Sequence, residues 1–232
     1  MIEIHDRVQL NAYLREHHIE TSLPESIHPH LSLYRFENGE RICSQGEPAA
    51  NLYVLVKGKI KIYTTSPEGK TLILSFKTPL ELIGDIEYVR KMDFLNTVEA
   101  VSSVMMIGVH HRWLTKYGND YAPFLKFLLG VITQKFAIKS ISMSFNLMYP
   151  VEVRLASYLL SVCFDESDNQ VVGQLPTNSL SDAANLIGTS YRHLNRVIQQ
   201  LSTAGLIERV NGNIWVKDKE KLSELANHNL YK

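Results

Sequence analysis

The sequence predicts an α+β protein that joins a β-rich N-terminal half to a helical C-terminal half. Three observations support this: short strands separated by glycines, one long helical repeat, and two short helices followed by a hairpin. The chain has 232 residues, of which 45% are hydrophobic and 21% are charged. Such a chain can bury one large core or two small ones, so we expect a globular protein.

The overall charge does not indicate a partner. There are 24 Lys and Arg residues and 24 Asp and Glu residues, so any binding face has to be local. Cys43 and Cys163 lie far apart, and no signal-peptide pattern is found, which indicates a reducing compartment. The longest apolar run, 127–132, is too short to span a bilayer. We therefore expect a soluble, cytoplasmic protein with no membrane partner.

The N-terminal half, 33–109, has the pattern of a series of strands. β-branched and aromatic residues dominate runs such as 51–56 and 59–63, and glycines separate these runs. This spacing is typical of a sandwich or barrel. The segment SPEGK at 66–70 predicts a hairpin, because Gly69 can take the positive φ of a tight turn.

A helical period follows from about Tyr121 to Met148, where Pro150 ends it. One apolar stripe advances by steps of three and four, as in a helix paired with a parallel copy of itself. This stripe is the predicted dimer seam and contains Phe127, Val131, Ile138, Ile141, Phe145 and Met148. A neighbouring stripe contains Leu125, Leu129, Ile132, Phe136 and Met143. The alternative is a helix buried within one monomer.

Residues 179–202 contain two short helices with a break between them. The sequence SLSD at 179–182 has the form of a capping box and predicts the start of the first helix. Gly188 permits a tight turn, and Thr189 or Ser190 then caps a second helix. This arrangement predicts a helix-turn-helix.

The second helix, from about Tyr191 to Ser202, is amphipathic. Its apolar residues are Leu194, Val197, Ile198 and Leu201. The opposite face fits the major groove of DNA, which has about the width of a helix. The residues on that face or at its margins are Tyr191, Arg192, Asn195, Arg196 and Gln199.

A hairpin is predicted after the second helix, with strands at 206–210 and 214–217 and a turn at 211–213. This hairpin is the predicted wing, and a further strand at 171–175 can pair with it. The alternative is a helical hairpin with a purely structural role, since helix-turn-helix geometry also occurs without DNA.

Several short motifs occur in one order along the chain. They are NGERI at 38–42, QGE at 45–47, LYVLVKGKIKI at 52–62, EGK at 68–70, LIGD at 82–85 and PVEVRLASYLL at 150–160. Together with the winged motif, they make the chain resemble the Crp/Fnr family of transcription regulators over nearly its full length. That family joins a cyclic-nucleotide-binding-type β-roll to a long dimer helix and a winged helix-turn-helix.

The resemblance implies three parts. These are an effector-sensing, jelly-roll-like β-roll at 1–117, a dimerisation helix and hinge at 118–149, and a winged helix-turn-helix at 150–232. It also implies a homodimer that binds a two-fold-symmetric operator in double-stranded promoter DNA, contacts RNA polymerase and responds to a small-molecule effector. No enzyme activity, catalytic residue or metal site is expected.

Two sets of DNA contacts are carried over from the family. Arg196 matches the recognition-helix arginine that the family uses against a guanine edge. Ser190 and Ser181 match positions that contact phosphates through hydroxyls or helix N-termini.

The recognition helix also departs from its relatives. Tyr191 and Arg192 stand where well-known relatives have an Arg and then a Glu, and Asn195 replaces a small residue. The half-site is therefore expected to differ from the familiar one. Arg192 either takes part in recognition or is a phosphate-facing or solvated cation.

The effector pocket is also assigned from the resemblance. Gly84-Asp85 keeps the family's opening, with Asp85 able to bond a ribose hydroxyl, but the stretch DFLNT at 93–97 has no Arg for a cyclic phosphate. A buried phosphate without a cation is costly, so cyclic AMP is not expected. The candidate pocket residues are Gly84, Asp85, Arg90, Lys91, Tyr63, Lys139 and Ser140. Lys139-Ser140 half preserves the family's adenine-contacting Thr-Ser pair.

Other sensing groups are not expected either, so the cofactor is unknown. An iron–sulfur cluster needs four cysteines and the chain has two. His110 and His111, if adjacent on a strand, point to opposite faces and cannot share one haem iron. Cys43 is either a redox thiol or a small buried hydrophobe.

Two other functions remain open. A cupin-like metalloenzyme needs an H-x-H followed by a carboxylate, but after His28-Pro29-His30, taken as part of a loop, Leu33 and Tyr34 occupy the required place. A cyclic-nucleotide-binding-like module that regulates another protein, without binding DNA, is the second alternative.

Overall fold

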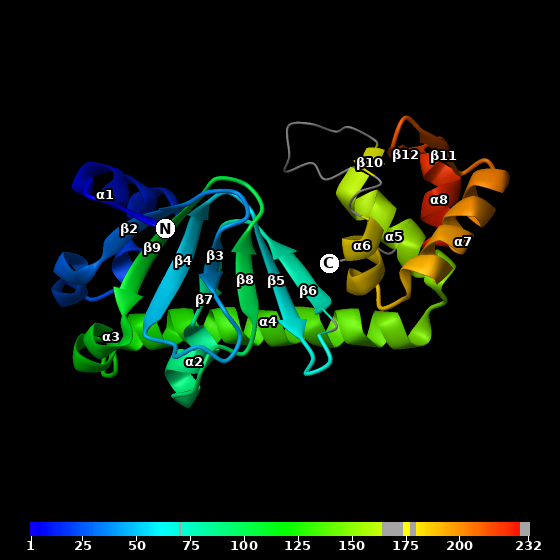
Figure 1. Ribbon diagram of the computed structural model, residues 1–232. Coiled ribbons are helices and arrows are strands. Elements are labelled where there is room, and N and C mark those ends of the chain that lie inside the picture. The colour runs from blue at the N-terminus through cyan, green and yellow to red at the C-terminus, as the bar shows by residue number, and fades with distance from the viewer. Residues whose placement is uncertain (70, 164–173, 177–179, 228–232) are drawn as a thin grey trace. The chain divides into compact units, whose positions relative to one another are not determined.

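The chain forms two compact units, Met1–Phe136 and Ala137–Lys232 (Figure 1). The computed structural model describes residues 1–69, 71–163, 174–176 and 180–227. Sheets dominate the first unit and helices the second, which confirms the predicted α+β class.

The first unit is built around two antiparallel sheets. The five-stranded sheet has the order β1-β2-β9-β4-β7, and the four-stranded sheet has the order β3-β8-β5-β6. The strands are β1 Ile2–Ile4, β2 Ser32–Phe36, β3 Arg41–Cys43, β4 Asn51–Lys57, β5 Ile60–Thr65, β6 Thr71–Lys77, β7 Glu81–Ile83, β8 Thr97–Ala100 and β9 Val104–His110. The helical elements are α1 Arg7–Glu16, η1 Glu20–Ser22, η2 Glu25–His30, α2 Asp85–Arg90, α3 His111–Tyr117 and α4 Ala122–Met148.

The five-stranded sheet is buried on both faces. Along β4, Leu52 and Val54 belong to a core shared with Leu114 of α3 and Phe124 of α4, whereas Leu55 belongs to the core between the two sheets. Successive side chains of a strand point to opposite faces, so burial on both faces requires a continuous apolar run. This explains the unbroken run of hydrophobic side chains from Leu52 to Val56 in β4.

Two glycines have the conformations that the turns require. The predicted hairpin joins β5 to β6, with Gly69 at φ 79° and its N–H donating to Ser66 O at 2.9 Å. Gly84 precedes α2 at φ 89°, and a Cβ there would lie 2.4 Å from Asn51 O. Glycine is therefore required at 84 for both its φ and its lack of a side chain.

The helix α4 confirms the predicted long helix. Phe124 and Leu128 are buried in the first unit, and Phe127 and Val131 pack partly against the same core. These two residues belong to the predicted dimer seam, and Ile132 of the neighbouring stripe packs there too, so residues of both predicted stripes contact this core. The exposed apolar residues of α4 are Leu125, Leu129, Phe136, Ile141, Met143, Leu147 and Met148.

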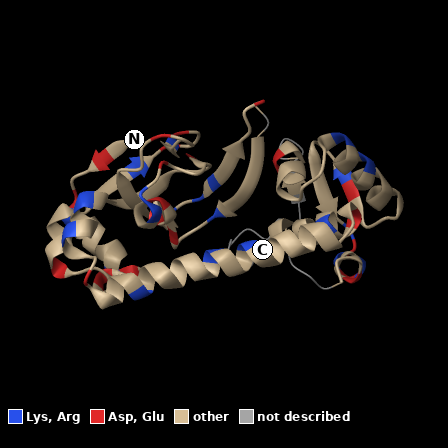
Figure 2. Cartoon of the chain, turned by 90° about the horizontal axis from the view of Figure 1, so that it is seen from below, with Lys and Arg blue, Asp and Glu red and all other residues tan. Residues whose placement is uncertain are grey.

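Charged residues are rare along α4. Its charged residues are Lys126, Lys135 and Lys139, and Figure 2 shows the helix as largely uncharged. A helix that is apolar around its circumference and keeps large apolar side chains exposed is typical of a helix that meets a partner. None of the described helices combines the length and apolar character needed to cross a bilayer.

The second unit packs helices against a small sheet. Its elements are α5 Val151–Cys163, β10 Gln174–Pro176, α6 Leu180–Leu186, α7 Tyr191–Thr203, β11 Ile207–Val210, β12 Asn213–Val216 and α8 Lys219–Leu225. The sheet has the order β10-β12-β11. Leu159, Leu194 and Ile214 are fully buried in one core that joins α5, α7 and β12.

The wing is tighter than predicted. Val210 pairs with Asn213, which leaves a two-residue turn of Asn211 and Gly212 instead of the predicted three-residue turn. Their φ values are 50° and 77°, the conformation that favours Asn-Gly in hairpins. The strand predicted at 171–175 is observed as β10, and residues 171–173 lie outside the described chain.

Candidate functional site

The break between α6 and α7 is a helix-turn-helix turn. Ser190 has an extended backbone, with φ −78° and ψ 147°, and its Oγ accepts from the His193 N–H at 3.1 Å. Ser190 is therefore the N-cap of α7, one of the two residues predicted for that role. Ser179, predicted as the cap of α6, lies outside the described residues, and Ser181 is exposed in the first turn of α6.

The helix α7 has one buried and one exposed face. Leu194, Val197, Ile198 and Leu201 are at most 5% exposed. Arg192, Arg196 and Gln199 follow one another by steps of four and three, so they share the opposite face, and all are exposed. The helix contains no acidic residue, which makes this face positively charged.

Asn195 is held by contacts within the unit. Its Nδ2 donates to Tyr191 O at 3.0 Å, and its Oδ1 accepts from Arg209 Nη1 at 3.4 Å. Arg209 lies exposed on β11 and was not predicted as a site residue, because only the folded structure brings it beside α7. It adds a further cation next to the exposed face of α7. Tyr191, 51% exposed, lies at the start of the same helix.

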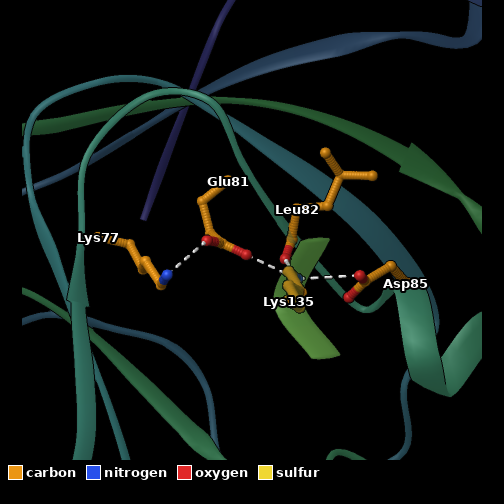
Figure 3. A network of polar contacts seen from close by, with 5 residues as sticks. All are labelled: Lys77, Glu81, Leu82, Asp85 and Lys135. Carbon is orange, nitrogen blue, oxygen red and sulfur yellow. Dashed lines mark hydrogen bonds and ion pairs between the residues drawn. The ribbon is translucent and has the colours of Figure 1, made fainter. Parts of the chain in front are cut away.

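In the β-roll, Asp85 is engaged by a lysine of α4 (Figure 3). Lys135 Nζ lies 2.9 Å from Asp85 Oδ2, 2.6 Å from Glu81 Oε1 and 2.5 Å from Leu82 O. Glu81 also pairs with Lys77 at 3.7 Å. Asp85, described from the sequence as able to bond a ribose hydroxyl, forms an ion pair with Lys135.

This network is electrically balanced and largely buried. Two lysines face two carboxylates, and the Asp85 and Glu81 side chains are 4% and 8% exposed, against 24% for Lys135. Removing charges from water is costly unless they are paired; here both carboxylates are ion-paired, and Lys135 also donates hydrogen bonds to Asp85 and to Leu82 O. The network therefore fastens α4 to β7 and the start of α2.

Three of the remaining pocket candidates, Tyr63, Arg90 and Lys91, lie in the first unit with Asp85. Arg90 and Lys91 are exposed, with Lys91 at φ 52° ending α2. Tyr63 Oη donates to Glu99 Oε2 at 3.4 Å. Lys139 and Ser140 belong to the second unit, on the C-terminal part of α4.

Both thiols are poor nucleophiles. Cys43 and Cys163 are buried, and burial raises the pKa of Cys43 to about 12 and that of Cys163 to about 11. Only the thiolate reacts readily, and it is scarce far below the pKa. Cys43 therefore has the environment of a small hydrophobe.

This environment predicts slow thiol modification. In a Cys163→Ala variant, Cys43 is expected to react with a disulfide reagent at pH 8 at least about a hundredfold more slowly in the native protein than in urea. Release of the coloured thiol measures both rates. Equal rates would show an accessible thiolate and favour Cys43 as the group that senses a redox signal.

The histidine candidates occupy different settings from those predicted. His110 ends β9, whereas His111 begins α3, so they do not alternate along one strand. Burial lowers the pKa of His111. His30 belongs to the 3-10 helix η2 rather than a loop, and its ring stacks on Trp113 at 3.6 Å. Among the described residues, no group of three or more His, Cys, Asp and Glu side chains could hold a metal ion.

Two family models match the chain in sequence order. Residues 33–114 match the cyclic nucleotide-binding domain, and residues 153–225 match the Crp-like helix-turn-helix domain. The chain belongs to the Crp/Fnr family. Both matches fall on the parts described above, the sheets of the first unit and the helix-turn-helix of the second.

Two regulatory proteins resemble the chain over most of its length. The regulatory protein YeiL of Escherichia coli O157:H7 is 27% identical over 197 residues, covering 84% of this chain and 85% of YeiL. A CRP-like cAMP-activated global transcriptional regulator of Mycobacterium tuberculosis is 20% identical over 210 residues, covering 90% and 94% of the two chains.

A solved structure shows the same fold. A putative Crp/Fnr transcriptional regulator from Eubacterium rectale has a TM-score of 0.77 at 18% identity, covering 90% of this chain and 97% of its own. The protein is thus a Crp-family transcription regulator with a helix-turn-helix and a cyclic-nucleotide-binding-type domain. Its relatives named here are regulators, not enzymes.

Proposed function

We propose that the protein is a homodimeric regulator in the cytoplasm that binds a two-fold-symmetric promoter operator and works with RNA polymerase. A small-molecule or redox signal other than cyclic AMP, sensed by the β-roll, controls this binding. The observation that carries the proposal is the exposed face of α7, where Arg192, Arg196 and Gln199 stand opposite a fully apolar buried face.

Each part of the winged motif has a role in this function. Arg196 reads a guanine edge, for which a bidentate guanidinium contact is geometrically suited. Arg192 and Arg209 add positive charge beside it, and Ser190 and Ser181 stand at the starts of α7 and α6, where backbone N–H groups favour phosphates. In a dimer, two such helices reach half-sites about one DNA turn apart, ~34 Å.

The balanced network around Asp85 supports an effector other than cyclic AMP. Lys135 already neutralises the carboxylate that would meet a ribose, and Lys77 is paired with Glu81. Binding of a cyclic nucleotide would therefore have to break an existing buried pair, without an arginine at 93–97 to hold the phosphate.

The test is selection of DNA sites from a random pool by the purified protein, without ligand and with cyclic AMP. We expect a two-fold-symmetric motif in the ligand-free sample and no gain with cyclic AMP. A motif that emerges only with cyclic AMP would overturn the effector proposal. No motif in either sample would favour the regulatory module that does not bind DNA.

The dimer is proposed to form through the exposed stripe of α4, which contains Leu125, Leu129, Phe136, Met143 and Leu147. Phe136, 76% exposed, and Ile141, 64% exposed, lie on different sides of the helix. Phe136→Glu is expected to convert the dimer into monomers in analytical ultracentrifugation, because a carboxylate would be buried at the seam. Ile141→Glu is expected to remain dimeric.

The reverse result would contradict this choice of stripe. A monomeric Ile141→Glu and a dimeric Phe136→Glu would place the seam on the stripe first predicted from the sequence. Monomeric wild-type protein at micromolar concentration would contradict the homodimer itself.

A further inference from the structure

Arg154 is a buried cation in the core of the second unit. It lies on α5, its residue is 8% exposed, and Leu155 and Leu159 of the same helix are fully buried. A guanidinium in such a place is costly unless its donors are used. Its partners therefore indicate what it does.

The Arg154 side chain reaches the turn between α6 and α7. Nη1 donates to Ile187 O, and it lies 3.4 Å from Gly188 O. Both carbonyls belong to the turn of the helix-turn-helix, more than thirty residues further along the chain.

The carbonyls of Ile187 and Gly188 are available because the N–H groups of the turn donate to carbonyls earlier in the chain. Gly188 has φ 68°, its N–H donates to Asn185 O at 3.3 Å, and the Thr189 N–H donates to Ala184 O at 2.9 Å. This is the Schellman ending of a helix, which satisfies the carbonyls of 184 and 185 but not those of 187 and 188. Arg154 supplies donors for the carbonyls of Ile187 and Gly188. Its positive charge also interacts favourably with the C-terminal end of α6.

The position of the turn controls where α7 begins. Ser190, the cap of α7, follows Gly188 by two residues, and α5 also contacts α7 directly. We propose that Arg154 is a positioning residue for DNA recognition. It fixes the turn and hence the angle at which α7 presents Arg196, without itself facing the DNA. This inference rests on the proposed function.

An arginine suits this role better than a lysine. Both carbonyls are met by one nitrogen, Nη1, which carries two N–H groups fixed in the plane of the guanidinium, whereas the N–H groups of an ammonium are not fixed in one plane. Space at the turn is also limited, since a Cβ on Gly188 would lie 3.3 Å from Arg154 Nη1.

The experiment compares Arg154→Met and Arg154→Lys in the full chain. Binding to the selected operator and to a scrambled duplex is measured at one salt concentration. We expect Arg154→Met to lose at least about tenfold in operator affinity but to keep its affinity for the scrambled duplex, because phosphate contacts are less sensitive to helix angle. Arg154→Lys is expected to recover part of the loss.

A matched core variant separates positioning from stability. Ile214→Val trims the same core away from the turn, and we expect it to lower the melting temperature while keeping the ratio of the two affinities. Equal losses for both duplexes in Arg154→Met, or an unchanged operator affinity, would overturn the inference. If Arg154→Met fails to fold, Arg154→Lys is the test variant. We then expect Arg154→Lys to lose affinity for the operator but not for the scrambled duplex.

A second readout does not depend on DNA. Hydrogen exchange of the Thr189 amide, which bonds to Ala184 O, is expected to quicken in the Arg154 variants relative to Ile214→Val. Unchanged exchange would show that Arg154 does not hold the turn. Failure of the wild-type protein to select any operator would instead count against the proposed function. The hydrogen-exchange result would still test whether Arg154 holds the turn.

Discussion

Lys135→Met is expected to destabilise the first unit by about 3 kcal/mol. Breaking a buried ion pair by removing one partner leaves uncompensated charge, which costs roughly 3–5 kcal/mol, and the partial exposure of Lys135 favours the lower end. Here the orphaned groups would be Asp85 and one oxygen of Glu81. Urea unfolding measures the change. In a Trp215→Phe background, the fluorescence comes from Trp113 in the first unit.

Two further variants test the cause of this loss. Lys126→Met removes an exposed lysine from the same helix and should change stability by less than about 0.5 kcal/mol. Adding Asp85→Asn to Lys135→Met should recover part of the loss, since it removes an unpaired charge. If Lys126→Met and Lys135→Met destabilise the protein equally, the network has no special role.

Arg196→Ala is expected to lose about 1–3 kcal/mol of binding free energy for the selected operator. Its affinity for a scrambled duplex should be nearly unchanged, because a base contact adds little to non-specific binding. Fluorescence anisotropy with labelled duplexes measures both affinities.

Arg15→Ala provides the charge-matched control. Arg15 is exposed on α1 of the first unit, so its loss changes the net charge equally without touching α7. This variant should bind both duplexes like the wild type. An equal loss for both duplexes in Arg196→Ala would instead identify Arg196 as a phosphate contact.

The local signals of the sequence predicted the C-terminal unit well. The Asn-Gly turn, Ser190 as a cap and the spacing of Leu194, Val197, Ile198 and Leu201 each depend on neighbouring residues, so they can be read directly from the chain. The wing turn was one residue too long because pairing of Val210 with Asn213 depends on register. Arg209 was missed because its contact with Asn195 joins two different elements.

The β-roll was predicted as a class of fold, but its polar contacts were not. Lys135 and Asp85 are fifty residues apart, and no period or motif connects them. The short strand β1 and the helix α1 were also missed. The strand has only three residues. The main sequence signal for α1 is its N-cap Asp6, whose Oδ1 accepts from the Gln9 N–H at 2.9 Å.

The apolar stripes of α4 show the limit of periodicity. Both stripes satisfy a helical repeat, so the sequence could not say which one packs on the sheets. Phe127, Val131 and Ile132 pack against the core of their own unit, whereas Leu125, Leu129 and Phe136 are exposed. Only tertiary contacts distinguish the two.

The burial of both thiols has a practical consequence. The chain contains two cysteines, and each is shielded within a core, so a third cysteine placed on the surface would be the site that takes up a maleimide dye or nitroxide. Ser181→Cys on α6 gives such a position. In a dimer it creates a symmetric pair of probes, whose separation would report directly on how an effector moves the two DNA-reading helices. Labelling of the two native cysteines is thus expected to contribute little signal in such a spectroscopic experiment.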